Sequence, residues 1–194
     1  MHAVILHEKD NDCKNYTKTY SKIISVLLEL KSTYENLEIT KNSLKSCMGC
    51  LDCWLKTPGE CVINDFGRIF ASKVINSDLF IILTPIVFGN YSNTIKRALE
   101  RLISNLHPYF ELINGETHHK RRYNKYPIVI PIGILNESNL EEERLFRALI
   151  KRNLINLYSE GSKEIIISSE NQVIEIENIL TFTLLNKNRM GVLV

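Results

Sequence analysis

Apolar and polar positions alternate along this chain in blocks that predict strands separated by helices. Five short runs are typical of strands buried on both faces, as in a parallel sheet, although the second run is weak. These runs cover residues 3–6, 37–40, 79–83, 127–132 and 165–167. The third run, Leu-Phe-Ile-Ile-Leu, is apolar at every position and is the strongest strand signal in the sequence.

Between these runs, apolar residues recur three or four positions apart, which is the spacing of amphipathic helices. Asp65 and Ser92 precede two such patterns. We expect both to be N-caps, because short polar side chains accept hydrogen bonds from the first free amides of a helix. The expected helices cover residues 16–31, the segment from Asp65 through Val74, residues 95–103, the segment from the capping-box-like run 138–141 to near Gly161, and residues 173–184.

A long polar connection, residues 107–126, shows neither the helix period nor the strand period. Connections of that length inside a compact domain are usually functional or mobile. We therefore expect an irregular segment here.

Strands that alternate with helices imply a parallel sheet covered on both faces. Because crossovers are right-handed, the simplest arrangement is a three-layer α/β sandwich with a five-stranded parallel sheet. The length predicts a single domain over residues 1–194. Ligands of such folds bind at the carboxyl ends of the strands. The segments after Leu6, Thr40 and Leu83 all follow strands, so we expect their chemistry to share that edge.

Composition narrows the class of protein. A hydrophobic fraction of 44% with 24% charged residues is ordinary for a soluble globular domain. A net charge of +2 is too small to indicate nucleic acid or a membrane surface as the partner. The sequence shows neither an apolar run long enough to span a bilayer nor a signal-peptide pattern. These features predict a cytoplasmic protein whose cysteines are reduced.

Four of the five cysteines form a compact motif with the spacing C-x2-C-x2-C-x7-C. They are Cys47, Cys50, Cys53 and Cys61. Thiolates two residues apart can reach a common centre, so such runs recur at iron–sulfur and zinc sites. The motif therefore indicates a metal site, with an iron–sulfur cluster as the first interpretation. Zinc and a set of redox-labile thiols are the alternatives.

Two stretches together resemble a known family, the flavodoxin-like NADPH-dependent FMN reductases, in their iron–sulfur flavoprotein branch. One stretch is the cysteine motif from Cys47 to Cys61, followed by Asp65. The other reads Thr84-Pro85-Ile86-Val87-Phe88-Gly89-Asn90-Tyr91-Ser92, followed by Lys96 and Glu100-Arg101. The order of strands and helices is similar over nearly the whole chain.

The resemblance implies an FMN at the carboxyl edge of the sheet and a 4Fe-4S cluster on the four cysteines. It assigns the flavin to Thr84, Pro85, Ile86, Val87, Phe88, Gly89 and Ser92, with Thr17 near the phosphate. Electrons would come from NAD(P)H or ferredoxin and pass to a small-molecule acceptor or a redox protein. The resemblance also implies a homo-oligomer, a dimer or tetramer, with residues 107–126 and 190–194 as candidate contacts.

The segment after the first strand departs from the family pattern. A glycine-containing phosphate loop is expected there, but this chain reads His7-Glu8-Lys9-Asp10. Acidic side chains repel a phosphate dianion, which leaves Lys14, Asn15 and Thr17 as phosphate partners. The alternative hypothesis is therefore a degenerate family member without flavin, acting as a metal-holding or partner-binding module.

Overall fold

The structure is a computed structural model that describes residues 1–9, 11–159 and 163–190, with residues 186–190 described by their backbone. The apolar side chains of residues 190–194, expected to make subunit contacts, lie outside the described part. No helix in the described part is both long and apolar enough to cross a membrane.

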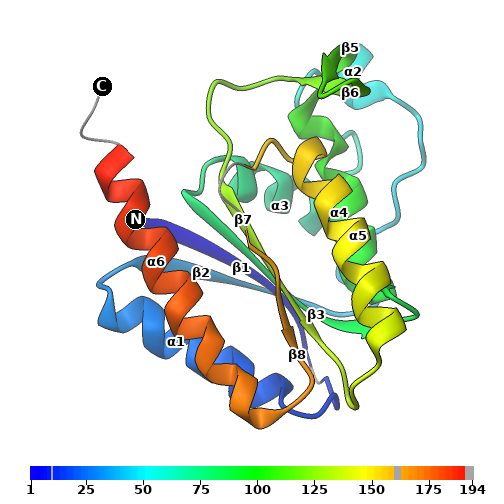
Figure 1. The fold of residues 1–194 in the computed structure, drawn as a ribbon. Coiled ribbons are helices and arrows are strands. Elements are labelled where there is room, and N and C mark those ends of the chain that lie inside the picture. Colours follow the sequence, from blue (N-terminus) through cyan, green and yellow to red (C-terminus); the bar gives the residue numbers. More distant parts are fainter. Residues whose placement is uncertain (10, 160–162, 191–194) are drawn as a thin grey trace.

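A parallel sheet forms the centre of the molecule (Figure 1). Its strand order is β2-β1-β3-β7-β8, and all four neighbouring pairs are parallel. The strands are β1 (His2–Glu8), β2 (Thr33–Ile39), β3 (Leu79–Val87), β7 (Ile128–Ile134) and β8 (Ile165–Ile167). The five predicted strands and the three-layer α/β class are confirmed.

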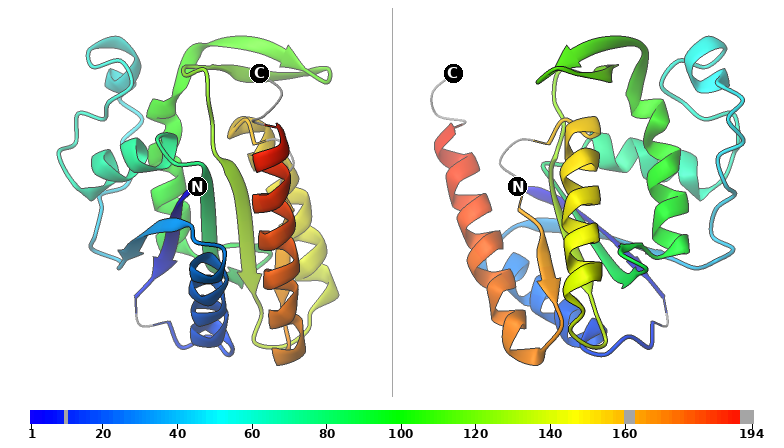
Figure 2. Two further views of the ribbon diagram at one scale, coloured as in Figure 1. Left: turned by 90° about the vertical axis from the view of Figure 1, so that its left-hand side faces the viewer. Right: turned by 45° about the vertical axis from the view of Figure 1, so that its right-hand side comes forward.

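Helices cover both faces of this sheet (Figure 2). On one face, α1 and α6 pack on a cluster that includes Ala3 and Ile5 of β1. On the other face, α3, α4 and α5 pack on a cluster that includes Val4 and Leu6. Successive β1 side chains thus enter opposite layers, as the pleat of a strand requires. The helices are α1 (Tyr16–Glu29), α2 (Asp52–Leu55), α3 (Phe66–Ile75), α4 (Asn93–Glu100), α5 (Leu140–Asn156) and α6 (Glu175–Met190), with 3₁₀ turns η1 (Arg101–Asn105) and η2 (Glu170–Ile174).

The helix caps agree with the sequence at two of three places. Asp65 accepts a hydrogen bond from the Gly67 amide, and Ser92 accepts one from the Ile95 amide. The predicted capping box at residues 138–141 is wrong: Asn139 caps α5, accepting from the amides of two glutamates in the first turn. Helix α5 also ends at Asn156, before the predicted end near Gly161.

The connection predicted to be irregular is a hairpin, and so is the stretch 84–92. Strand β5 (Leu106–Ile113), which starts one residue before that connection, pairs antiparallel with β6 (Glu116–Arg121). The stretch 84–92 continues β3 to Val87 and returns as β4 (Asn90–Tyr91). Because a two-stranded ribbon apart from the main sheet needs little apolar sequence, the polar composition of the first hairpin concealed it.

The cysteine segment, residues 47–61, lies at the opposite end of the molecule from the carboxyl ends of the strands. After β2 the chain follows α4 and η1. Arg97 of α4 donates a hydrogen bond to the Lys41 carbonyl, and Arg101 of η1 donates one to the Lys45 carbonyl. Helix α4 starts beside the carboxyl end of β3, so this path leads towards the amino ends. Figure 1 shows α2 beside β5 and β6, far from the end of β8.

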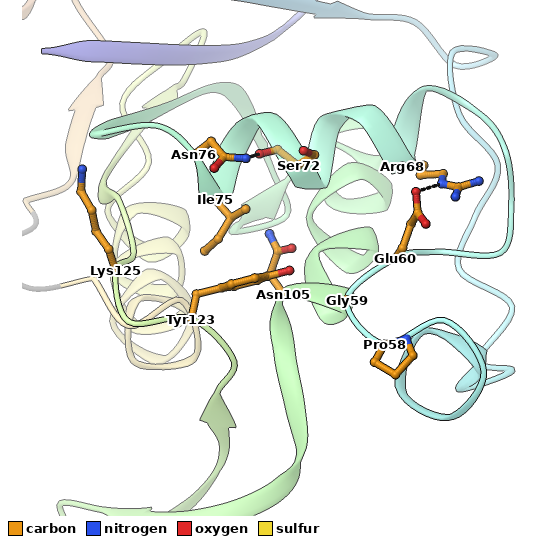
Figure 3. Close-up of a pocket in the computed structure, with 10 residues that line it drawn as sticks. All are labelled: Pro58, Gly59, Glu60, Arg68, Ser72, Ile75, Asn76, Asn105, Tyr123 and Lys125. Atoms are coloured by element: carbon orange, nitrogen blue, oxygen red, sulfur yellow. Dashed lines mark hydrogen bonds and ion pairs between the residues drawn. The ribbon is translucent and has the colours of Figure 1, made fainter.

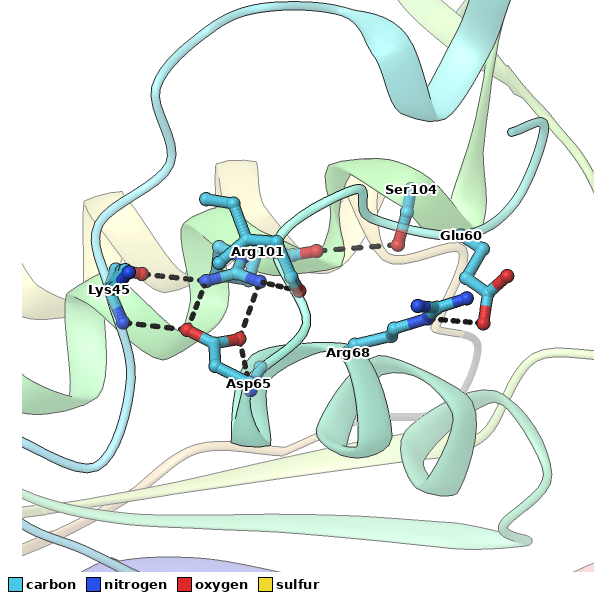
Figure 4. A network of polar contacts seen from close by, with 8 residues as sticks. Lys45, Glu60, Asp65, Arg68, Arg101 and Ser104 are labelled. Atoms are coloured by element: carbon cyan, nitrogen blue, oxygen red, sulfur yellow. Dashed lines mark hydrogen bonds and ion pairs between the residues drawn. The ribbon is translucent and has the colours of Figure 1, made fainter. Parts of the chain in front are cut away.

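Arg101 fixes both ends of this segment (Figure 4). Its side chain is 1% exposed and forms a two-pronged ion pair with Asp65, at 2.8 Å and 3.0 Å. The same guanidinium donates to the carbonyls of Lys45 and Ile63, which flank the cysteines. A Cβ on Gly67 would come within 2.7 Å of the Arg101 guanidinium carbon, so the glycine leaves room for this side chain.

The ion pair also changes the acidity of Asp65. Burial alone would raise the pKa of this carboxyl, but hydrogen bonds from Arg101 and from the Lys45 and Gly67 amides, together with the Arg101 charge, hold the pKa below its ordinary value. The charged form is therefore favoured in the folded protein, and protonation of Asp65 opposes folding.

Replacing Asp65 by Asn would leave the Arg101 guanidinium buried without its counter-charge. We expect Asp65→Asn to lower the free energy of unfolding at pH 7 by about 3–5 kcal/mol, measured by urea denaturation. The matched control is Glu141→Gln, which removes an exposed carboxylate paired with Arg144 and should change the stability far less than Asp65→Asn does. Equal losses in the two variants would contradict the assignment.

The pH dependence gives the same comparison a second readout. The pKa of Asp65 is lower in the folded than in the unfolded chain, so its contribution is complete above the unfolded value of about 3.9 and is lost as the pH falls through the folded value. The difference in stability between the native protein and Asp65→Asn should therefore shrink below about pH 4.

Candidate functional site

The carboxyl edge of the sheet brings together the ends of β1, β3 and β7. The Glu8 carboxylate at the end of β1 accepts a hydrogen bond of 2.5 Å from the Ser92 hydroxyl, which follows β4. The Lys14 amide donates to the Asn136 side chain at 2.8 Å and so links the segment after β1 to the segment after β7. This edge is where open α/β sheets bind ligands.

The β3–β4 hairpin contains seven of the eight residues that the resemblance assigns to the flavin. Three of them are structural: Thr84 and Ser92 are buried, with the Thr84 hydroxyl accepting from the Ser92 amide, and Ile86 is 7% exposed in the core. Pro85 is half-buried in β3. Val87 and Phe88 are 43% and 89% exposed, which leaves the hairpin tip as the accessible apolar surface.

The hairpin tip is held in one conformation against α5. Phe88 and Gly89 have φ values of 50° and 70°, which a two-residue hairpin turn requires. The Gly89 amide donates to the Glu142 carboxylate at 3.2 Å, and a Cβ on Gly89 would come within 2.5 Å of the Leu145 Cβ. Tyr91, the other aromatic residue of the hairpin, is 4% exposed and packs edge-on against Phe146. Phe88 alone of these two aromatic rings is accessible.

The start of α1 offers donors for an anion at the same edge. Its N-cap, Asn15, has φ 65° and makes no capping hydrogen bond with its side chain. The side-chain amide nitrogen of Asn15, Nδ2, is buried, with no hydrogen-bond partner among the described residues. Thr17 is exposed in the first turn. An uncapped helix N-terminus beside an unpaired amide suits a phosphate group.

Glu8 opposes a phosphate at this place. Its carboxylate accepts hydrogen bonds from Asn11 and Ser92, both at 2.5 Å. Its backbone amide donates a hydrogen bond to the Tyr16 hydroxyl at 2.8 Å. Two polar side chains that could donate to a phosphate thus already donate to a carboxylate. The edge fits FMN in its helix start and in its exposed hairpin tip, while the negative charge of Glu8 weakens the fit at the phosphate.

The expectation that the cysteine motif shares this edge is wrong. Trp54, directly after Cys53, donates from its indole nitrogen to the carbonyls of Ile103 and Leu106, at 3.2 Å and 3.1 Å. Its ring also lies 4.8 Å from the His119 ring. Trp54 therefore anchors the cysteine segment to η1 and the β5–β6 hairpin, at the amino end of the sheet.

The cysteine segment folds tightly on itself. Gly49 and Leu51 both have positive φ, and the Gly59 amide donates to the Cys53 carbonyl at 3.0 Å, which turns the chain back towards Cys61. Burial raises the pKa of the Cys53 thiol, and so does the charge of the other three cysteines of the motif, Cys61, Cys47 and Cys50. The four thiols are therefore electrostatic neighbours.

Proximity does not amount to a preformed metal site. Cys47 and Cys50 are exposed, Cys61 is half-buried and Cys53 is buried. Across the residues that the structure describes, no group of three or more His, Cys, Asp or Glu side chains is arranged to hold a metal ion. The ligand types of the motif suit a cluster or zinc, whereas the observed arrangement of the side chains does not.

A cavity of about 600 Å³ lies against this segment (Figure 3). It is bounded by residues 58–60, α3 and the segment before β7, and Figure 3 shows the Tyr123 ring beside Asn105 and Ile75. Its two cationic residues are both in ion pairs, Arg68 with Glu60 and Lys125 with Asp78. This pairing disfavours an anionic ligand.

Sequence reasoning missed contacts that form only in three dimensions. It named Asp65 and Arg101 without predicting that they pair, and the acceptors of the Trp54 indole are main-chain carbonyls far along the chain. A buried arginine leaves no periodic signal of its own. The acidic Glu8 was visible in the sequence, but its hydrogen bond to Ser92 was not.

Comparison with known proteins establishes the fold. No protein-family model and no curated protein sequence matches the chain. An NAD(P)H:quinone oxidoreductase from Methanothermobacter marburgensis has a TM-score of 0.66 at 11% identity over 92% of this chain and 94% of that one. An FMN-dependent NADH-azoreductase from Bacillus anthracis str. Ames Ancestor, in complex with FMN, has a TM-score of 0.65 at 11% identity over 94% and 98%.

A flavodoxin of Streptococcus pneumonia TIGR4 has a TM-score of 0.54 at 14% identity, over 92% of this chain and 94% of that chain. At such low identities, what these structures share with the present chain is the path of the backbone. The chain has the flavodoxin-like α/β fold.

Proposed function

We propose that the chain is an FMN-dependent oxidoreductase that takes electrons from NAD(P)H or ferredoxin and passes them to a small acceptor. The observation that carries the proposal is the uncapped start of α1, where the side-chain amide of Asn15 is buried and unpaired among the described residues. This helix start lies at the same edge of the sheet as the exposed hairpin tip. Structures with this fold include an FMN-dependent NADH-azoreductase and an NAD(P)H:quinone oxidoreductase.

The residues at this edge have distinct tasks in the proposal. When bound, FMN supplies hydride and one-electron chemistry, so the protein needs no catalytic acid or base of its own. Asn15, Thr17 and the α1 amides bind the phosphate. Phe88 and Val87 form an apolar cover that excludes water from the ring, and Glu142 keeps the hairpin tip in place through the Gly89 amide.

The charge of Glu8 sets the strength of binding. We expect Glu8→Gln to tighten FMN binding about 5- to 10-fold, because a unit of like charge near a phosphate costs on the order of 1 kcal/mol. Calorimetric titration with FMN under reducing conditions measures the effect, which should diminish at high salt. Glu29→Gln, at the far end of α1, makes the same charge change and should leave the affinity unaltered.

Reduction of the bound flavin by NADH, followed by its absorbance, tests the oxidoreductase proposal directly. The proposal is refuted if neither the native chain nor the Glu8→Gln variant binds FMN. That outcome would favour the second candidate, a flavin-free module that holds a metal or a partner. The hydrogen bonds that Asn11 and Ser92 donate to Glu8 are the observation behind this candidate.

The four-cysteine segment is proposed as a second redox or metal centre, with a 4Fe-4S cluster as the first candidate and zinc as the second. The support is the spacing of the motif and the thiolate ligand type, which suits both centres. The centre lies away from the hairpin tip of the same chain, so the two sites are not halves of one cofactor pocket within a chain.

Anaerobic reconstitution with ferrous iron and sulfide tests this centre. We expect about four iron atoms per chain, and loss of the cluster absorbance in Cys53→Ser, because a 4Fe-4S cluster takes four thiolate ligands. Cys13→Ser is the matched control, since the fifth cysteine follows β1 outside the motif. Zinc without iron would assign a zinc site instead, and equal metal contents in the two variants would refute both.

A further inference from the structure

A cavity of about 310 Å³ lies between α4 and α5, bounded by β4, η1 and the β5–β6 hairpin. Its walls are largely apolar. The apolar residues are Leu99, Leu102, Ile103, Leu106, Leu149 and Leu157. The volume lies at the lower end of the range of small-molecule sites, about 300–1,000 Å³. None of the cysteines lines it, and neither does the exposed tip of the β3–β4 hairpin.

One buried hydroxyl at this cavity is incompletely hydrogen-bonded. Tyr91 is 4% exposed, and its oxygen accepts a hydrogen bond of 3.4 Å from the Asn153 side chain. No hydrogen bond among the described residues uses its O–H group as a donor. Burial raises the pKa of Tyr91 to about 12, so the proton stays in place near neutral pH. Leaving a buried donor without an acceptor costs about 1–3 kcal/mol.

A second polar group lies on the β6 side of the cavity. The Nδ1 atom of His119 is buried, with no hydrogen-bond partner among the described residues. The His119 ring lies 4.8 Å from the Trp54 ring and 4.6 Å from the Phe110 ring. These two contacts give the imidazole a fixed place at the border of the cavity.

The charges at this cavity balance. Lys96 and Glu100 are its charged residues in the described part, one helical turn apart on α4 and of opposite sign. The remaining polar groups are neutral amides, the Tyr91 hydroxyl and the His119 imidazole. A net-neutral apolar cavity favours an uncharged ligand, since a charge would lose its hydration without gaining a partner.

We propose that this cavity is a binding site for an uncharged, apolar molecule with a carbonyl group, whose oxygen accepts the Tyr91 hydroxyl hydrogen. The apolar walls bury the hydrocarbon part of the molecule, and its carbonyl oxygen accepts from the unused donor. The site is separate from the FMN site proposed above, so its occupation requires no flavin.

Paired probes test the role of the carbonyl. The probe 1-tetralone is a bicyclic aromatic ketone, and tetralin has the same ring skeleton without the oxygen. By calorimetry on the full chain, 1-tetralone should bind about 5- to 10-fold more tightly than tetralin, the ratio expected for one net hydrogen bond of about 1 kcal/mol. Tyr91→Phe keeps the ring against Phe146 and should abolish the difference between the two probes.

Two further measurements locate the binding. Trp54 is the single tryptophan of the chain and touches His119, so its fluorescence should change as 1-tetralone binds. Tyr109→Phe is the matched control, because Tyr109 lies on β5 with 65% of its surface exposed, and it should bind both probes as the native chain does.

The proposal is overturned if 1-tetralone shows no saturable binding to the native chain, or if Tyr91→Phe retains the preference for it over tetralin. It is also overturned if added FMN displaces the ketone competitively, which would place the probe at the carboxyl edge. Failure of FMN to bind leaves the expected result unchanged, so the two proposals fail independently.

Discussion

The buried ion pair between Arg101 and Asp65 determines where the cysteine segment lies. A guanidinium that is 1% exposed needs a counter-charge and hydrogen-bond acceptors inside the protein. Asp65 supplies the charge, and the carbonyls of Lys45 and Ile63 accept further hydrogen bonds. These acceptors lie before and after the four cysteines, so one side chain closes the base of a loop that otherwise folds on itself.

This closure separates two kinds of chemistry that the sequence seemed to place together. The hairpin tip and the start of α1 lie at the carboxyl edge of the sheet, whereas Trp54 anchors the cysteines at the amino end. Ligands bind at the carboxyl ends of parallel strands, and this rule applies to a segment only if the segment remains near the end of the strand that it follows. The segment after β2 does not stay there, because Arg97 of α4 and Arg101 of η1 hold it along these two elements.

The fold was predictable because its core is periodic. The apolar runs of β1, β3 and β7 enter two clusters on opposite faces, and such strands are recognisable without any contact information. The caps Asp65 and Ser92 were also predictable, since capping is local. The β5–β6 hairpin was missed because its stability comes from cross-strand pairs, and the position of the cysteine segment was missed because it depends on one arginine some 36 residues from Asp65.

At the candidate site, the sequence named the hairpin residues without separating the buried ones from the exposed ones. Thr84, Ile86 and Ser92 support the hairpin from within, while Val87 and Phe88 carry its exposed surface. Tyr91 alternates with them and turns inward, towards Phe146 and the cavity between α4 and α5. The same hairpin thus presents one aromatic ring to the carboxyl edge and another to an interior space bordered by His119, which touches Trp54. A ligand in that space would contact both the β3–β4 hairpin and His119, which touches the cysteine segment through Trp54. Such a ligand can couple the two ends of the sheet only if it binds two arrangements of the hairpin with different affinity.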